Sequence, residues 1–174
     1  MLVRNKIWEE LKQAHANVLC ILWYNNRQRK CERWYQMFIA ISASAGTFGF
    51  LFNDLAPLYS SLAIAFVSIV KSLYPQFLQP EKELCILDEL MDYYNEYMVD
   101  MERLFYKFDH DKMTEDETFD EMYKLKKAEC AKFSMLNKFV RSIPEKRKKK
   151  IENDSTEYIN RVYFNKYESD ESKQ

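Results

Sequence analysis

Hydrophobic residues are concentrated in one part of this chain, where almost no charge interrupts them. Between Trp34 and Val70 the only charged residue is Asp54. A helix of a water-soluble domain normally carries charge on its outer face, so this uncharged stretch is unusual. The segments 34–52 and 55–74 each approach the length of about 20 residues that crosses a hydrocarbon core. We therefore predict that these two segments form a transmembrane helical hairpin.

Positive charge flanks the predicted hairpin at its outer ends and is absent from the turn between its helices. The positive-inside rule then places both chain termini in the cytoplasm. The alternative is a buried hairpin in a soluble helical bundle, for which the rest of the chain offers few apolar faces. The flanking basic residues are Arg27, Arg29, Lys30, Arg33, Lys71 and Lys82.

Small residues recur at helical spacing within both apolar segments. This pattern predicts close helix packing through small faces. An alternative is a weakly polar stripe that lines a water-filled path in an oligomer. The residues of this candidate face are Ser42, Ala45, Gly49, Ser61, Ala65, Ser68 and Ser72.

The composition favours an all-helical membrane protein. Two glycines and four prolines in 174 residues are too few for the turns that a sheet requires. We predict four parts. They are an N-terminal cytoplasmic or interfacial helix over 1–33, the hairpin over 34–78, a cytoplasmic antiparallel helical hairpin over 81–143, and a basic segment with a short helix and an acidic tail over 144–174.

The N-terminal helix has a net charge of +4 over residues 1–33. We expect it to continue into the first apolar segment or to lie along the bilayer surface. We expect no cleavable signal peptide, because this charged segment precedes the first apolar block.

Apolar residues after Pro80 are spaced alternately by three and four. This spacing predicts a helix that pairs along one narrow stripe. Its expected partner is a second helix that begins at a capping box, Thr114 to Glu117, and ends near Val140. Self-association is the alternative. The predicted seam consists of Leu84, Leu87, Met91, Tyr94, Met98, Met101 and Phe105.

A basic run follows Pro144 and precedes a last helix predicted near Ile151 to Tyr167. The run fits a solvated helix start, an anionic-lipid contact or a phosphate-bearing messenger site. Its residues are Lys146, Arg147, Lys148, Lys149 and Lys150.

The chain lacks the sequence patterns that are typical of catalytic, metal-binding or cofactor-binding sites. Its four cysteines are scattered, and Gly46 and Gly49 form no phosphate loop. The sequence Asp109-His110-Asp111 fits a loop between helices better than an acid–base site. The net charge of −6 over residues 81–143 argues against binding of nucleic-acid polymers. We predict a non-enzymatic protein with no cofactor and no metal.

The layout resembles the SLATT families, the SMODS- and SLOG-associating two-transmembrane effector domains. The resemblance is carried by Trp23 to Trp34 (WYNNRQRKCERW), by the apolar hairpin, and by the spacing of tyrosine, methionine and leucine from Leu84 to Phe105. It covers most of the chain through architecture and composition. It brings no catalytic residue with it.

The resemblance implies a multi-pass effector of the bacterial inner membrane that acts in antiviral defence by abortive infection. Such an effector oligomerises and permeabilises the membrane when a partner triggers it. The expected partners are the lipid bilayer, further copies of the chain, and a sensor protein or an enzyme that makes cyclic oligonucleotides. The alternatives are a passive membrane-anchored scaffold that binds a partner through its cytoplasmic helices, and a small channel regulator.

Overall fold

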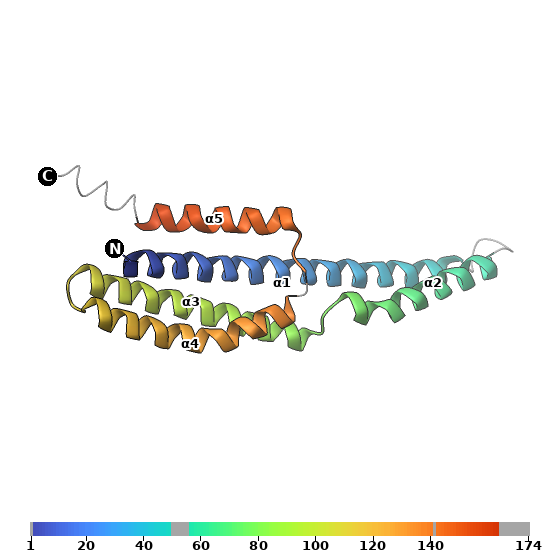
Figure 1. Cartoon of the computed structure of the whole chain (residues 1–174). Coiled ribbons are helices and arrows are strands. Elements are labelled where there is room, and N and C mark those ends of the chain that lie inside the picture. The colour runs from blue at the N-terminus through green and yellow to red at the C-terminus, as the bar shows by residue number, and fades with distance from the viewer. Residues whose placement is uncertain (1, 50–55, 141, 164–174) are drawn as a thin grey trace. The chain divides into compact units, whose positions relative to one another are not determined.

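The computed structural model of the chain describes residues 2–49, 56–140 and 142–163, and this described part is all-helical, without strands (Figure 1). Within the helices, the side chains of residues 43–49, 56–60, 63 and 75–77 are not described. The five helices are α1 (Leu2–Gly49), α2 (Ala56–Phe77), α3 (Glu81–Asp109), α4 (Glu115–Phe139) and α5 (Glu145–Tyr163).

The helices divide into two compact units. We call Met1–Tyr24 with Cys85–Gln174 the bundle unit, and Asn25–Leu84 the hairpin unit. The boundary predicted at residue 33 falls inside α1, which continues to Gly49. The division after Tyr24 separates a helix start that packs in a core from a continuation that is largely exposed.

The first part of α1 is the central helix of the bundle unit. In Figure 1, α5 lies on one side of it, and α3 and α4 lie on the other. Neighbours on both sides explain why its buried positions are frequent and closely spaced, unlike those of a surface helix. The buried apolar residues of this segment are Val3, Ile7, Leu11, Ala14, Ala16, Ile21 and Tyr24.

Helix α3 buries a broader face than the predicted seam. Five of the seven seam residues are buried, whereas Met91 and Met98 are only half-buried on its flank. Leu90, Tyr97 and Leu104 are buried instead. The face widens because α3 contacts both α4 and α1. The buried members of the predicted seam are Leu84, Leu87, Tyr94, Met101 and Phe105.

Local chemistry defines the helix ends. The carbonyl of Pro80 accepts a hydrogen bond from the backbone N–H of Glu83, and the carbonyl of Pro144 accepts one from Arg147, so each proline starts a helix. Asp111 adopts a positive φ of 53° after α3. Aspartate tolerates this left-handed conformation, so the turn forms without glycine.

The predicted capping box at the start of α4 is confirmed. The Thr114 Oγ1 accepts a hydrogen bond from the Glu117 backbone N–H at 3.3 Å, and the Thr114 backbone N–H donates to Glu117 Oε2 at 2.9 Å. The two bonds satisfy donors that the helix start would otherwise leave unpaired.

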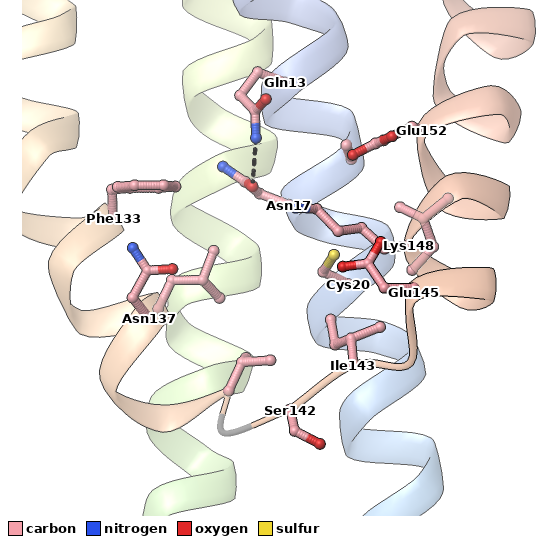
Figure 2. Close-up of a pocket in the computed structure, with 14 residues that line it drawn as sticks. Gln13, Asn17, Cys20, Phe133, Asn137, Ser142, Ile143, Glu145, Lys148 and Glu152 are labelled. Carbon is pink, nitrogen blue, oxygen red and sulfur yellow. Dashed lines mark hydrogen bonds between the residues drawn. The ribbon is translucent and has the colours of Figure 1, made fainter.

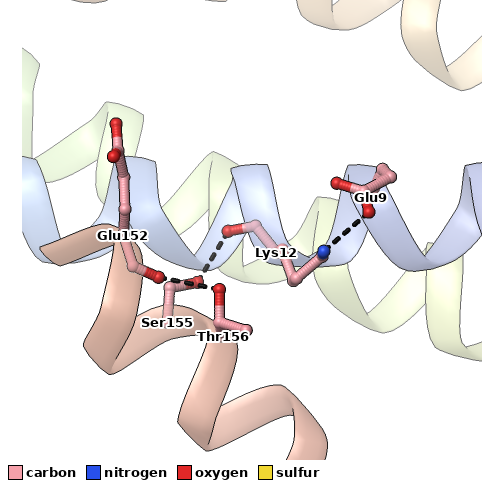
Figure 3. Close-up of polar contacts among 5 residues, drawn as sticks. All are labelled: Glu9, Lys12, Glu152, Ser155 and Thr156. Atoms are coloured by element: carbon pink, nitrogen blue, oxygen red, sulfur yellow. Dashed lines mark hydrogen bonds and ion pairs between the residues drawn. The ribbon is translucent and has the colours of Figure 1, made fainter. Parts of the chain in front are cut away.

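Helix α5 packs on α1 through few but specific contacts. The buried Ser155 hydroxyl donates to the Lys12 carbonyl at 2.7 Å (Figure 3). The ring of His15 stacks on Tyr158 with centroids 4.2 Å apart. Only Ile151, Ser155 and Ile159 of α5 are buried, at the spacing of four that marks one helix face.

In the hairpin unit, α2 runs antiparallel to the last part of α1. Tyr35 packs on Tyr74 with ring centroids 4.2 Å apart, and Phe38 meets Phe66 edge-on at 5.9 Å. Most other large apolar side chains of this unit remain exposed. They are Trp34, Met37 and Ile41 on α1 and Leu62, Ile64, Ile69 and Leu73 on α2.

The predicted membrane localisation is wrong for the described part of the chain. None of its helices combines the length and apolar character that crossing a membrane demands. This finding overturns the prediction of a multi-pass inner-membrane protein with cytoplasmic termini, which rested on the scarcity of charge.

We expect Thr114→Ala to lower the free energy of unfolding by about 1 kcal/mol, because the helix start loses its cap. Urea unfolding followed by circular dichroism measures this change. Thr156→Ala is the matched control, since the exposed Thr156 hydroxyl only bonds the Glu152 carbonyl of its own helix. Equal effects of the two substitutions would contradict the capping role.

Candidate functional site

The small-residue face predicted for the apolar segments is only partly described. Ser61, Ala65, Ser68 and Ser72 are exposed on α2. The Ser68 hydroxyl donates to the Ile64 carbonyl at 2.8 Å, so its hydrogen-bonding capacity is partly used by its own helix. On α1, Ser42 is half-buried, and the side chains of Ala45 and Gly49 lie outside the described ones.

The basic run forms the first turns of α5. Lys146, Lys148, Lys149 and Lys150 are exposed, whereas Arg147 is half-buried with its guanidinium 5.8 Å from the centroid of the Trp23 ring. This cation–π contact uses one of the five charges for packing. The other four basic side chains are exposed, and their arrangement does not favour lipid, phosphate or solvent as the contact.

The bundle unit contains an open cavity of about 540 Å³ between α1, α4 and α5 (Figure 2). This volume falls in the range of small-molecule sites. Its buried residues are Ala16, Asn17, Leu136 and Ile151. Exposed polar side chains surround the opening, among them Gln13, Asn137, Glu145, Lys148 and Glu152.

Asn17 is the buried polar group of this cavity. Its Oδ1 accepts a hydrogen bond from Gln13 Nε2 at 3.1 Å (Figure 2). Its Nδ2 is fully covered. Asn17 also lowers the pKa of Tyr94 through a side-chain hydrogen bond, which places this amide beside the Tyr94 hydroxyl.

The first turns of α5 place charge on the cavity. Glu145, Lys148 and Glu152 share one helix face because they are three and four residues apart. Burial raises the pKa of the Cys20 thiol, and Glu152 raises it further against the opposing effect of Lys148. Cys20 is therefore a protonated, unreactive thiol at neutral pH.

A second polar cluster joins three helices of the bundle unit. Glu10 of α1 pairs with Lys126 of α4 and accepts a hydrogen bond from the Tyr97 hydroxyl of α3 at 3.3 Å. Tyr94 donates to Glu129 Oε1 at 3.0 Å. Burial raises the pKa of Glu129, and the nearby Glu10 adds to this effect.

Burial is also the main reason why the pKa values of Tyr94 and Tyr97 are raised. Both phenols therefore remain neutral hydrogen-bond donors. The carboxylates serve as their acceptors, so the cluster fixes the register of α1, α3 and α4 and has no open position for a substrate. Across the described ranges, no three histidine, cysteine or acidic side chains group as metal ligands do.

The sequence prediction missed Asn17, Glu10 and Glu129. A signal for Asn17 was present, because it lies three residues after Ala14 and four before Ile21 on the apolar face of a helix. Glu10 and Glu129 carried no such signal, because a charged residue at the edge of an apolar face normally points to solvent.

Comparison with known proteins gives no match: no family model fits the chain, and no curated protein or solved structure is significantly similar to it. The resemblance to the SLATT families therefore stays a prediction.

We expect Glu129→Gln to change the pH dependence of stability. The raised pKa of Glu129 means that the native state holds this proton more tightly than the unfolded state. The wild-type chain should therefore lose stability as pH rises above the ordinary glutamate value, and Glu129→Gln should remove that loss while keeping an acceptor for Tyr94. Urea unfolding between about pH 4 and 7 measures the difference.

Glu121→Gln on the same helix is the control of opposite sign. A hydrogen bond from Lys124 lowers the pKa of the exposed Glu121, so the ionised form favours the native state. As pH rises, the wild-type chain should become slightly more stable than Glu121→Gln. If the stability of the wild type and that of Glu129→Gln changed with pH in the same way, burial would not be what raises the pKa of Glu129.

Proposed function

We propose that this chain is a non-enzymatic assembly module whose copies associate through the hairpin unit. The observation that supports this proposal is the exposed apolar face across α1 and α2. On α1 the exposed residues Trp34, Met37, Phe38 and Ile41 follow helical spacing. On α2 the corresponding residues are Leu62, Phe66, Ile69 and Leu73.

The extent of this face is what a stable interface needs. The eight large side chains of this face each leave between 37% and 71% of their surface exposed. At about 150–250 Å² for a large side chain, they present roughly 1,000 Å² per copy. A standard interface buries about 800 Å² per partner, and single-chain proteins rarely expose so large an apolar patch.

A second copy of the chain is the occupant that best fits this face. The face carries no charge between Trp34 and Val70 apart from Asp54, so its partner must also be uncharged there. Elsewhere in the described chain, exposed apolar residues such as Val99 and Tyr123 stand among polar neighbours. A twofold pair of hairpin units would cover each face with an identical one.

Small residues beside this face support close approach of the helices. Ser61, Ala65, Ser68 and Ser72 are exposed on the flank of the apolar residues of α2. Small side chains let neighbouring helix backbones come near each other. Close packing is therefore the role that we propose for them.

The resemblance to conflict-system effectors gives this assembly a biological setting. From the function that this resemblance implies, we keep one step: copies of the chain cluster after a partner binds the bundle unit. Membrane permeabilisation is not part of this proposal, because the described helices are unsuited to crossing a membrane.

The proposal predicts that the full-length chain has a mass of two or more copies in buffer without detergent, measured by light scattering after size exclusion. Leu62→Glu with Ile69→Glu should yield single copies. Burying an unpaired carboxylate costs several kcal/mol, so association should weaken by at least about 100-fold.

Val99→Glu is the matched control, because Val99 is 54% exposed on α3 and belongs to the bundle unit. It should leave the mass unchanged, and circular dichroism should show equal helicity in all three chains. A single-copy mass for the wild type, or equal dissociation by Val99→Glu, would contradict the proposal.

A further inference from the structure

His15 of α1 contacts the last helix of the bundle unit through one face of its ring. This ring stacks on that of Tyr158 of α5, with centroids 4.2 Å apart and planes inclined by 7°. The Nδ1 atom of His15 is fully covered and has no hydrogen-bond partner. A covered ring nitrogen without an acceptor fits the neutral imidazole, in which one of the two nitrogens carries no proton. The contact between α1 and α5 is therefore made by an uncharged His15.

The charged groups around His15 do not compensate for a charge on its ring. On its own helix, the Lys12 ammonium one turn away pairs with Glu9 at 2.6 Å. Two carboxylates and one guanidinium of α5 line the opening beside the ring. Burial nevertheless lowers the pKa of His15, so these carboxylates do not outweigh the loss of water around it. The charged lining residues from α5 are Asp154, Glu157 and Arg161.

Protonation of His15 would act on a helix that few buried side chains hold in place. Of the described residues of α5, only Ile151, Ser155 and Ile159 are buried. The Ser155 hydroxyl donates to the Lys12 carbonyl, one turn before His15 on α1 (Figure 3). A protonated ring would carry a covered N–H without an acceptor and a charge with little water around it. Both costs disappear when α5 leaves the ring.

We propose that the stacked His15–Tyr158 pair is a pH-sensitive contact, which holds α5 on α1 while His15 is neutral and releases it when His15 is protonated. Histidine is the side chain that ordinarily changes charge between about pH 5 and 8. Because burial lowers the pKa of His15 in the docked state, the released state binds the proton more tightly. Docking of α5 therefore weakens as pH falls through the ordinary histidine pKa of 6.5.

Hydrogen exchange of the full-length chain, followed by mass spectrometry at about pH 7.5 and about pH 5, tests this proposal. The protection of the α5 amides, corrected for the intrinsic effect of pH on exchange, is divided by that of the α3 amides in the same sample. This ratio removes changes in the stability of the whole bundle unit, on which Glu129 acts in the opposite direction. We expect the ratio to fall at least about threefold at the lower pH.

Three variants assign the effect to His15. His15→Phe keeps a flat ring against Tyr158 but cannot gain a proton, so its ratio should be equal at both pH values. His15→Gln should lose the pH dependence as well, and it replaces His15→Phe if circular dichroism shows that the latter has lost helicity. His110→Gln is the matched control, because the exposed His110 stacks on Tyr106 after α3, with ring centroids 4.0 Å apart, and not on α5. It should keep the full fall.

The measurement distinguishes this proposal from its alternatives. An unchanged ratio in the wild type would overturn it, because α5 would then stay docked around a protonated ring. A ratio that rises at the lower pH would also overturn it, since the carboxylates of Asp154 and Glu157 would then hold the imidazolium. If the fall persisted in both His15 variants, or vanished in His110→Gln, a group other than His15 would control the docking of α5.

Discussion

The half-buried Glu10 of α1, which contacts partners from α3 and α4, constrains how these three helices pack. One carboxylate receives the Tyr97 hydroxyl of α3 and the Lys126 ammonium of α4, and it comes from the central helix α1. The Glu10 side chain is 18% exposed and that of Lys126 is 45% exposed, so these contacts contribute more to the register of the three helices than to their stability. The apolar contacts around this point supply stabilisation, whereas the polar cluster determines which helix positions face one another.

The hairpin unit follows the opposite principle, because its surface is apolar and its fixed contacts are few. Tyr35–Tyr74 and Phe38–Phe66 join its two helices, and the large side chains beside them remain open. An uncharged exposed face makes a single chain prone to aggregate, whereas in an assembly it serves as a binding surface. The two units therefore differ in role: the bundle unit specifies its helix register through a half-buried polar cluster, and the hairpin unit offers a surface for association.

Helix content and helix ends followed from the sequence, because they depend on neighbouring residues. The capping box at Thr114 and the helix start after Pro80 are local features of this kind, whereas the last helix was predicted near Ile151 to Tyr167 and begins earlier, at Glu145. Membrane crossing was inferred from the scarcity of charge, and this inference was wrong, because none of the described helices is both long and apolar enough. The cavity around Asn17 was out of reach, since it requires knowing that α4 and α5 approach the same part of α1.

The sparse attachment of α5 has a consequence for local stability. Helix α5 buries three residues, one of them Ser155, which is as few as α4 buries and fewer than α1 or α3 buries. Elements with little buried apolar contact open at a lower free energy than the domain as a whole. Detachment of α5 alone would remove Ile151 and Glu152 from one wall of the cavity. Fluctuation of this last helix would thus open the interior near Asn17 to solvent while the more deeply packed α1 and α3 stay folded.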